Sequence, residues 1–327
     1  MNCRYTLIFL MATLCAFSPK AQAQQIAKDT SFTFNSAFKS TKAFKATATI
    51  PVIATGDTVQ TAHDLVYCKI GDRPLMLDAF YPKQAYFKGK VPVVVMIHGG
   101  GWRSGNRTMH WPMAQKLAAK GYAVFTIEYR LSTEAIYPAG VNDVKSAIKY
   151  VRANAAKYRA DASKIAIWGY SAGGQMAALI GTTNNSALYK GDGSNDKYAD
   201  AVQAIIDVDG ILAFIHPESG EGDDSKKTSA ATYWFGASKT ARPDLWKQAS
   251  ALNHVGKQTP PILFINSSVS RMHAGRNDMI KQLDSLQIYH EVHTFSDAPH
   301  TFIMFEPWFT PALNYTAAFL DKTFRHK

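Results

Sequence analysis

The chain has 327 residues, of which 46% are hydrophobic, and it carries 36 basic and 25 acidic residues for a formal net charge of +11. This composition excludes an intrinsically disordered chain and is sufficient for one large core. The positive charge suits an acidic polysaccharide or simply solubilises the surface; nucleic-acid binding is disfavoured because no nucleic-acid motif is present.

The first 23 residues have the features of a secretory signal peptide. Arg4 precedes an apolar run over residues 5–17, and Ala21-Gln22-Ala23 has the small-x-small pattern of a cleavage site. The run is too short to span a membrane, so we expect no stable membrane insertion. Cleavage leaves Cys68 as the remaining cysteine, so no intramolecular disulfide is possible. We expect a periplasmic or secreted protein.

The next segment, residues 24–61, is rich in Thr, Ala, Lys and Ser and shows no clear period. It predicts an extended N-terminal arm or linker. Residues 64–70 and 75–81 are typical of two strands of a hairpin, joined by a turn that contains Gly71. We therefore expect one catalytic domain over residues 62–327.

A glycine-rich loop follows the first buried strand. Residues 93–97 are continuously apolar, as in a strand buried on both faces. They run into the sequence HGGGW at 98–102, where glycines let backbone N–H groups turn inward. We expect the N–H groups of Gly100 and Gly101, together with that of Ala172, to form an oxyanion hole.

Strands and helices alternate through the rest of the chain. The expected strands cover residues 93–97, 122–128, 164–168, 202–208, 262–266 and 289–295, and the expected helices cover 106–120, 138–157, 172–181, 275–287 and 311–325. This alternation predicts an α/β fold with a mostly parallel central sheet and helices on both faces.

The segment Gly169-Tyr170-Ser171-Ala172-Gly173 has the pattern G-x-S-x-G. It lies between a short apolar strand and a helix-forming run, which predicts a sharp strand-to-helix turn that exposes the Ser171 hydroxyl. The N-terminus of the following helix favours a developing negative charge. We interpret Ser171 as a nucleophile rather than as part of a purely structural turn.

Two insertions interrupt the alternation. Residues 184–199 are polar, and their acidic stretch does not match the spacing of a calcium loop, so we expect a loop and no metal site. Residues 211–253 should form a lid over the site. The lid carries Tyr233-Trp234-Phe235 and Trp246, which either stack on sugar rings or pack inside the lid.

The general base is expected in the loop after the last strand, and His300 occupies that position. We expect His98 to anchor the glycine-rich loop by hydrogen bonds. The histidines expected to be surface, cap or strand residues are His110, His216, His254, His290 and His293.

The HGGGW loop, the segments 128–132, 137–143 and 161–174, and Pro299-His300 together resemble a known enzyme group. This group is the α/β-hydrolases of the hormone-sensitive-lipase-like and feruloyl-esterase-like carbohydrate esterases, and the resemblance spans most of residues 64–325. It implies an α/β-hydrolase fold, a triad in the chain order serine, acid, histidine, and an HGGG oxyanion hole. It also implies ester hydrolysis without a cofactor.

The acid of the triad departs from the pattern of the group. These enzymes usually place an Asp after the strand at 262–266, but Ser270, followed by Arg271, occupies that position here. A hydroxyl cannot stabilise an imidazolium as a carboxylate does. Some α/β-hydrolases take the acid from the preceding strand, which makes Asp209 our first choice. The remaining candidates are Asp207, Glu218, Glu221 and Asp297.

Aromatic residues lie in loops close to the expected catalytic face, and flat rings with few charges suit carbohydrate esters. The polar composition of residues 211–253 disfavours long acyl chains. The expected substrate-binding residues are Trp102, Trp111, Tyr170, Arg271 and Trp308.

We therefore expect a secreted serine esterase that removes acetyl, other short acyl or methyl esters from plant cell-wall polysaccharide or oligosaccharide through an acyl-enzyme. Two alternatives within the same fold are a feruloyl esterase and a serine exopeptidase. A non-catalytic polysaccharide-binding relative is the alternative from another class, because the usual Asp after residues 262–266 is missing.

Overall fold

The computed structural model describes residues 29–191, 193 and 195–325. The expected signal peptide, residues 1–23, lies outside the described residues. Within the described part of the chain, no helix is both long and apolar enough to cross a membrane.

Eight strands form a single sheet. They are β1 (Val59–Ile70), β2 (Arg73–Pro82), β3 (Val91–Ile97), β4 (Ala123–Ile127), β5 (Ala160–Tyr170), β6 (Ala204–Val208), β7 (Ile262–Asn266) and β8 (His290–Thr294). Their spatial order is β1-β2-β4-β3-β5-β6-β7-β8. The β1–β2 hairpin pairs antiparallel with itself and with β4, whereas all the other neighbouring strands are parallel. The mostly parallel sheet predicted from the sequence is confirmed.

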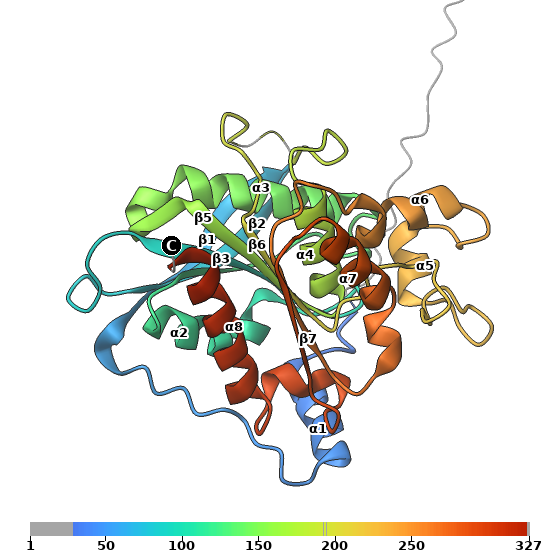
Figure 1. Ribbon diagram of the computed structural model, residues 1–327, viewed down its shortest axis with the longest axis horizontal. Helices are drawn as coiled ribbons and strands as arrows, with labels where there is room; N and C mark the ends of the chain where they lie inside the picture. Colours follow the sequence, from blue (N-terminus) through green and yellow to red (C-terminus); the bar gives the residue numbers. More distant parts are fainter. Residues whose placement is uncertain (1–28, 192, 194, 326–327) are drawn as a thin grey trace, which may run out of the picture.

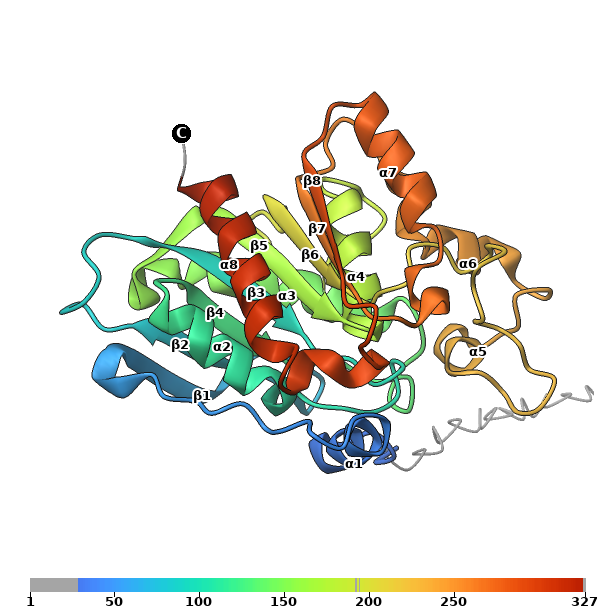
Figure 2. The same cartoon turned by 60° about the horizontal axis from the view of Figure 1, so that its bottom comes forward.

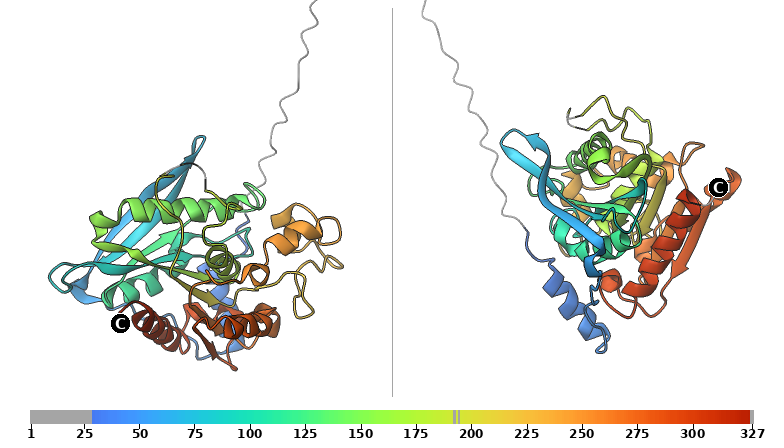
Figure 3. Two further views of the ribbon diagram at one scale, coloured as in Figure 1. Left: turned by 45° about the horizontal axis from the view of Figure 1, so that its top comes forward. Right: turned by 90° about the vertical axis from the view of Figure 1, so that its left-hand side faces the viewer.

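Helices cover both faces of this sheet, as predicted. They are α1 (Phe34–Phe44), α2 (Trp111–Ala119), α3 (Ala139–Ala153), α4 (Ala172–Thr182), α5 (Ala230–Phe235), α6 (Pro243–Gln248), α7 (Arg276–Ser285) and α8 (Phe309–Phe324). The buried side chains of α2 and α8 share one hydrophobic cluster, and those of α3, α4 and α7 share the other. Figure 1 and Figure 2 show α2 beside α8, and the left view of Figure 3 shows α3 (green) and α8 (dark red) on opposite sides of the sheet.

The central strand β3 shows why its sequence is continuously apolar. Side chains along a strand alternate between the two faces of the sheet. Val93 and Val95 therefore join the cluster of α3 and α4, whereas Val94 and Met96 join that of α2 and α8. All seven residues of β3 are buried. The carboxyl ends of β3, β5, β6 and β7 consequently meet at one edge of a rigid sheet, where ligand sites of α/β folds form.

The sequence predicted an extended arm or linker over residues 24–61, and the described part of this segment departs from that prediction. Residues 34–44 form α1, and β1 begins within the predicted arm, at Val59. Thr33 caps α1: its side chain accepts a hydrogen bond from the backbone N–H of Ser36, whose hydroxyl accepts one from the N–H of Thr33. This reciprocal cap satisfies N–H groups that the first turn of a helix otherwise leaves unpaired.

Helix α1 packs against η6 (His300–Met304), the 3₁₀ turn that begins with His300. Phe34 and Phe38, one helical turn apart, each place their ring centroid 5.2 Å from that of Phe305. The hydroxyls of Thr41 and Thr301 are hydrogen-bonded in the buried contact between the two elements. The i, i+4 and i+7 spacing of Phe34, Phe38 and Thr41 places them on one helix face.

The insertion at residues 211–253 forms α5 and α6, which Figure 1 shows together at the right-hand end of the molecule. Trp234, Phe235 and Trp246 are buried there and pack around Phe214. Of the two expectations for these aromatic residues, packing inside the lid is therefore the one that the structure favours. Tyr233 is the exception, because 46% of it is exposed.

Candidate active site

Ser171 lies on the sharp turn between β5 and α4 that the sequence predicted, with φ of 57°. The flanking glycines permit this turn. A Cβ on Gly169 would lie 1.9 Å from the carbonyl oxygen of Gly173, and one on Gly173 would lie 2.2 Å from that of Ile97. The backbone N–H of Ser171 also donates to the carbonyl of Val208 at 2.8 Å. Helix α4 is thus held tightly against the sheet, with the serine at its start.

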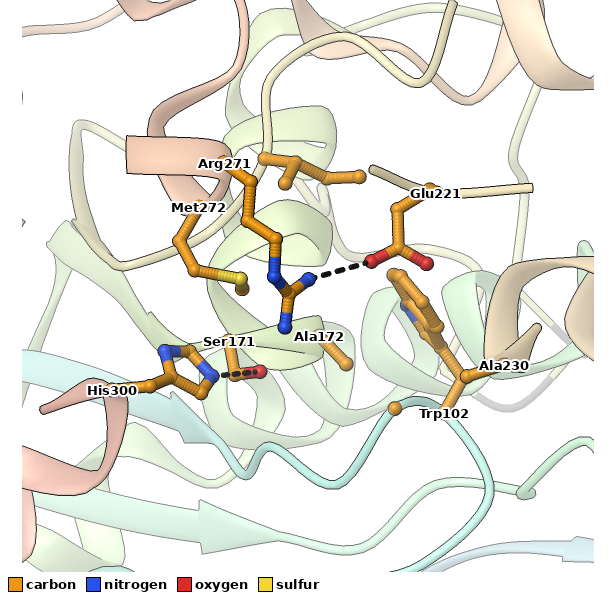
Figure 4. Close-up of a pocket in the computed structure, with 10 residues that line it drawn as sticks. Trp102, Ser171, Ala172, Glu221, Ala230, Arg271, Met272 and His300 are labelled. Atoms are coloured by element: carbon orange, nitrogen blue, oxygen red, sulfur yellow. Dashed lines mark hydrogen bonds and ion pairs between the residues drawn. The ribbon is translucent and has the colours of Figure 1, made fainter. Parts of the chain in front are cut away.

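His300 enters the site from the other end of the chain. Its Nε2 lies 2.9 Å from Oγ of Ser171 (Figure 4). Its backbone carbonyl accepts a hydrogen bond from the hydroxyl of Tyr170 at 2.9 Å, and the Tyr170 ring lies 5.1 Å from the imidazole, centroid to centroid. Tyr170 is fully buried. Tyr170 was expected to bind the substrate. It instead supports His300 from inside the protein and does not face the substrate.

Asp209, directly after β6, completes the chain of hydrogen bonds. Its Oδ2 lies 2.9 Å from Nδ1 of His300, and its Oδ1 accepts from the backbone N–H of Ser267 at 2.7 Å. Nε2 of His273 lies 3.4 Å from the same Oδ1. Burial of Asp209 acts to raise its pKa, but the contacts with His273, His300 and Ser267 outweigh burial and lower the pKa to about 2. The carboxylate is therefore charged at neutral pH.

The other candidate carboxylates are engaged elsewhere. Glu218 accepts from the backbone N–H of Gly275, and Asp297 forms a salt bridge with Lys45. Asp207 accepts from the N–H of Gly210, and Glu221 lies 3.4 Å from Arg271. Within the described structure, none of these four carboxylates is hydrogen-bonded to His300.

The glycine-rich loop brings Gly101 to the cavity that Ser171 lines. The carbonyl of Gly100 accepts from both the N–H and the hydroxyl of Ser104, which closes a tight turn. Gly100 has φ of 120°, and a Cβ there would lie 2.2 Å from the Ser104 carbonyl oxygen, so only glycine fits. Gly101 and Ala172 line the cavity beside Ser171. Ala172 begins α4, where a backbone N–H has no partner inside the helix.

His98 lies behind this loop, as predicted. Its Nδ1 is 2.7 Å from the carbonyl oxygen of Gly99, and its ring stacks on Tyr129 with 4.5 Å between centroids. His110, one of the histidines expected to be surface, cap or strand residues, is the N-cap residue of α2 and is buried against Trp168. Burial, followed by the nearby His98, lowers the pKa of His110 to about 3, so its ring is neutral at neutral pH.

A cavity of about 180 Å³ opens above Ser171 (Figure 4). It is lined by Gly101, Trp102, Ser171, Ala172, Ile211, Glu221, Ala230, Arg271, Met272 and His300. Trp102 forms part of the wall because its Nε1 donates to Gln175 and its ring stacks on Trp234, with 4.9 Å between centroids. Two expected substrate-binding residues, Trp102 and Arg271, therefore do face the cavity.

Two other expected substrate-binding residues face elsewhere, and their placement in the site is corrected. The indole N–H of Trp111 donates to Asp78, and that of Trp308 donates to Asp297. Trp308 is buried in the core on the α8 side. The sequence placed both residues in loops close to the expected catalytic face. The direction in which a ring points, however, depends on partners that the sequence does not identify.

Several residues of the site were not found from the sequence. Ile211, Ala230 and Met272 line the cavity, and His273 lies beside the buried carboxylate of Asp209. None of them belongs to a motif: Ile211 lies in an irregular segment, Ala230 is the first residue of α5, and Met272 and His273 lie in a 3₁₀ turn after β7. Glu221 had been considered only as a triad acid, whereas the structure places it opposite Arg271.

The arrangement has the geometry of an activated nucleophile. A hydroxyl is hydrogen-bonded to an imidazole, which is in turn oriented by a charged and buried carboxylate. Among the described residues, no three His, Cys, Asp or Glu side chains are grouped as metal ligands would be. The described residues can therefore support acyl transfer through serine.

The sequence of the chain is similar to those of named esterases. The chain is 29% identical to esterase LipC of Mycobacterium tuberculosis over 201 residues, which are 61% of this chain and 49% of LipC. It spans about half the length, or less, of these curated relatives, which include a second esterase and a carboxylesterase of the same species.

Solved structures share the fold. A bifunctional GH43-CE protein of Bacteroides eggerthii superposes with a TM-score of 0.67 at 24% identity, over 81% of this chain and 38% of that one. The butyrate-bound esterase Est2 of Thermogutta terrifontis superposes with a TM-score of 0.66 at 23% identity, over 80% of this chain and 94% of that one.

The sequence model of the BD-FAE family matches residues 77–272. This segment contains β3, the glycine-rich loop, the turn at Ser171 and Asp209. Since it is more than half of the 327 residues, the chain belongs to the BD-FAE family of α/β-hydrolase-fold proteins.

Proposed function

We propose that the protein is a serine hydrolase of carboxylic esters, with Ser171 as nucleophile, His300 as general base and Asp209 as the acid that orients it. The observation that carries the proposal is the continuous hydrogen-bonded chain from Ser171 through His300 to Asp209, with distances of 2.9 Å at both links. Ser171, at one end of this chain of hydrogen bonds, faces a cavity that is lined by Gly101 and Ala172, two of the three expected oxyanion donors.

In this mechanism, Oγ of Ser171 attacks the ester carbonyl carbon while Nε2 of His300 takes the hydroxyl proton. The imidazolium that forms is stabilised by the Asp209 carboxylate. The N–H groups of Gly100, Gly101 and Ala172 are the proposed donors to the oxyanion of the tetrahedral intermediate. His300 then gives its proton to the leaving alcohol. A water molecule, deprotonated by His300, attacks the acyl-enzyme, and His300 returns that proton to Oγ of Ser171 as the bond between Ser171 and the acyl group breaks and the acid is released.

The proposed substrates are acetyl, other short acyl or methyl esters on plant cell-wall polysaccharide. A cavity of about 180 Å³ is smaller than the roughly 300–1,000 Å³ of pockets that enclose drug-sized ligands. Short acyl groups fit such a volume better than long chains do. Support also comes from two structural neighbours, one a GH43-CE protein and one an esterase solved with butyrate bound.

The test is a comparison of kcat/KM on 4-nitrophenyl esters of increasing acyl length, followed by acetate release from acetylated xylan and pectin. We expect acetyl esters to be cleaved fastest and the Ser171→Ala protein to be inactive. A methyl ferulate assay and an aminoacyl-anilide assay separate the feruloyl esterase and the exopeptidase. Wild-type protein that binds acetylated xylan but cleaves none of these substrates would instead be a binding relative.

We also propose that residues 1–23 are removed during export, so that the enzyme acts in the periplasm or outside the cell. The support is the charged start, apolar run and Ala-x-Ala pattern of this segment. N-terminal sequencing of protein recovered from its native host tests the proposal. A mature chain that still begins at Met1 would contradict it.

A further inference from the structure

We infer that Arg271 binds a carboxylate carried by the substrate, so that the preferred ester lies on a saccharide containing a uronic acid. This inference rests on the proposed esterase function and specifies its substrate class. Arg271 belongs to the 3₁₀ turn η5 (Ser270–His273), which begins four residues after the end of β7. Figure 4 shows its guanidinium group directed into the cavity, between Glu221 and the turn that carries Ser171 and Ala172.

The present partner of Arg271 holds it loosely. Nη1 of Arg271 lies 3.4 Å from Oε1 of Glu221, whereas a strong hydrogen bond between ions is about 2.7–2.9 Å long. The Arg271 side chain is 53% exposed, but that of Glu221 is only 15% exposed. Burial raises the pKa of Glu221, against the opposing effects of Arg271 and His300. The guanidinium group thus keeps most of its five donors for another anion.

A second, larger cavity continues from the catalytic one and shares Glu221, Ala230 and Arg271 with it. Its volume is about 630 Å³, which is enough for saccharide units beside the ester. Tyr233, which is half-exposed, lines it, and the guanidinium of Arg103 lies 3.8 Å from the centre of that ring. The aromatic ring that is available to a sugar is therefore in this outer cavity.

The lining of the outer cavity has a small excess of positive charge, with four basic side chains against three acidic ones. Lys226 and Lys227 line it, are exposed, and form no salt bridge within the described part of the chain. Arg103 is paired with Asp29 at 3.3 Å, and Asp223 is the exposed acidic residue on the same wall. A bound uronic acid would meet the free lysines outside and the guanidinium fork inside, where a carboxylate can be held by two parallel hydrogen bonds.

The test uses two substrates that differ in one group. They are methyl glucuronoside and methyl glucoside, each acetylated at the same hydroxyl, so that a carboxylate replaces a hydroxymethyl group. We expect wild-type kcat/KM to favour the uronoside by about 10- to 100-fold, as for a hydrogen bond to a charged group. The preference should shrink at high salt, because the outer cavity is open to solvent.

Two variants and one control assign the preference. Arg271→Gln is expected to abolish it, mainly through a higher KM for the uronoside. Glu221→Gln removes the competing carboxylate and should increase it. The control is Arg242→Gln at the N-cap of α6, since the Arg242 side chain is 52% exposed, pairs with Asp244 at 2.7 Å, and lines neither cavity. Arg242→Gln should keep the wild-type preference.

The inference and the proposed function fail in different ways. Equal wild-type kcat/KM for the two esters, or an equal loss on both in Arg271→Gln, would overturn the inference and leave the esterase intact. Calorimetric binding of both substrates to the Ser171→Ala protein tests recognition without turnover. If that protein binds the uronoside no more tightly than the glucoside, Arg271 serves only to hold Glu221, and the inference is wrong whether or not the wild type hydrolyses esters.

Discussion

Nδ1 of His300 lies 2.9 Å from Oδ2 of Asp209, a residue that follows β6 rather than the next strand, β7. The turn after β7 still contributes, because the backbone N–H of Ser267 donates to the other oxygen of the same carboxylate. The end of β6 therefore supplies the carboxylate. The turn after β7 supplies a hydrogen bond that helps to keep this buried carboxylate ionised.

The first prediction concerns Ser171. Ser171→Ala removes the hydroxyl that His300 contacts and should lower kcat on 4-nitrophenyl acetate by at least about 10⁴-fold. The side chain makes no other hydrogen bond in the described structure, so thermal unfolding should be nearly unchanged. Retention of more than about a tenth of the activity would exclude the acyl-enzyme mechanism proposed above.

The second prediction concerns the acid. Asp209→Asn keeps the shape of the side chain but removes the charge that stabilises the imidazolium, so kcat should fall on the order of 10⁴-fold. The matched control is Glu218→Gln, because Glu218 contacts Gly275 rather than His300. Steady-state kinetics of both variants decide the question: comparable activities in the two would show that the acid lies elsewhere.

The third prediction uses the pH dependence of stability. Burial, and also the charge of Asp209, raise the pKa of Asp207, while the N–H of Gly210 opposes this shift. The folded state therefore holds a proton that the unfolded chain releases above about pH 4, and stability is lost as the pH rises through the raised pKa. Asn cannot ionise, so Asp207→Asn should remove this loss. Between pH 5 and 8, where the wild type loses stability, the free energy of unfolding of the variant should therefore rise relative to that of the wild type.

Urea unfolding at several pH values measures this effect, and the two proteins should differ least below about pH 4, where both carry a neutral side chain. Asp72→Asn is the control, because Asp72 is exposed in the turn between β1 and β2. A difference between Asp207→Asn and wild type that does not change with pH would show that packing, not ionisation, determines the effect.

The fourth prediction concerns the contact between α1 and η6. The hydroxyl of Thr41 donates to the carbonyl of Ala37, so its bond with Thr301 must be donated by Thr301. Thr41→Val should cost about 1–3 kcal/mol of unfolding free energy, because it leaves the buried Thr301 hydroxyl without this acceptor. The double variant Thr41→Val, Thr301→Val should recover part of that cost. A strictly additive cycle would show that the two hydroxyls are not coupled.

The turn at Ser171 and the glycine-rich loop could be predicted from the sequence because their geometry is encoded locally. Gly169 and Gly173 lie where a Cβ would collide with backbone atoms. The need for glycine at these two positions appears directly in the sequence as the G-x-S-x-G pattern. The sheet was predictable for a similar reason, since strands such as β3 that are buried on both faces need apolar residues at every position.

Side chains whose direction depends on distant partners could not be predicted in this way. Trp111 and Trp308 are turned toward Asp78 and Asp297, and neither partner is recognisable from the neighbouring sequence. Helix α1 is a different case. The spacing of Phe34 and Phe38 and the capping pair at Thr33 were readable signals, but the many Thr, Ala, Lys and Ser residues around them obscured the period.

The packing of α1 on Phe305 also has a practical consequence. Protein produced from residue 62 onward, as the expected domain boundary would recommend, would lack the rings of Phe34 and Phe38 and would leave an aromatic surface uncovered next to η6. Such a surface favours self-association. If a shortened protein aggregates or has low activity, the cause would therefore be the loss of the α1 contact with η6, which begins with His300. It would not be a defect in the chemistry of Ser171.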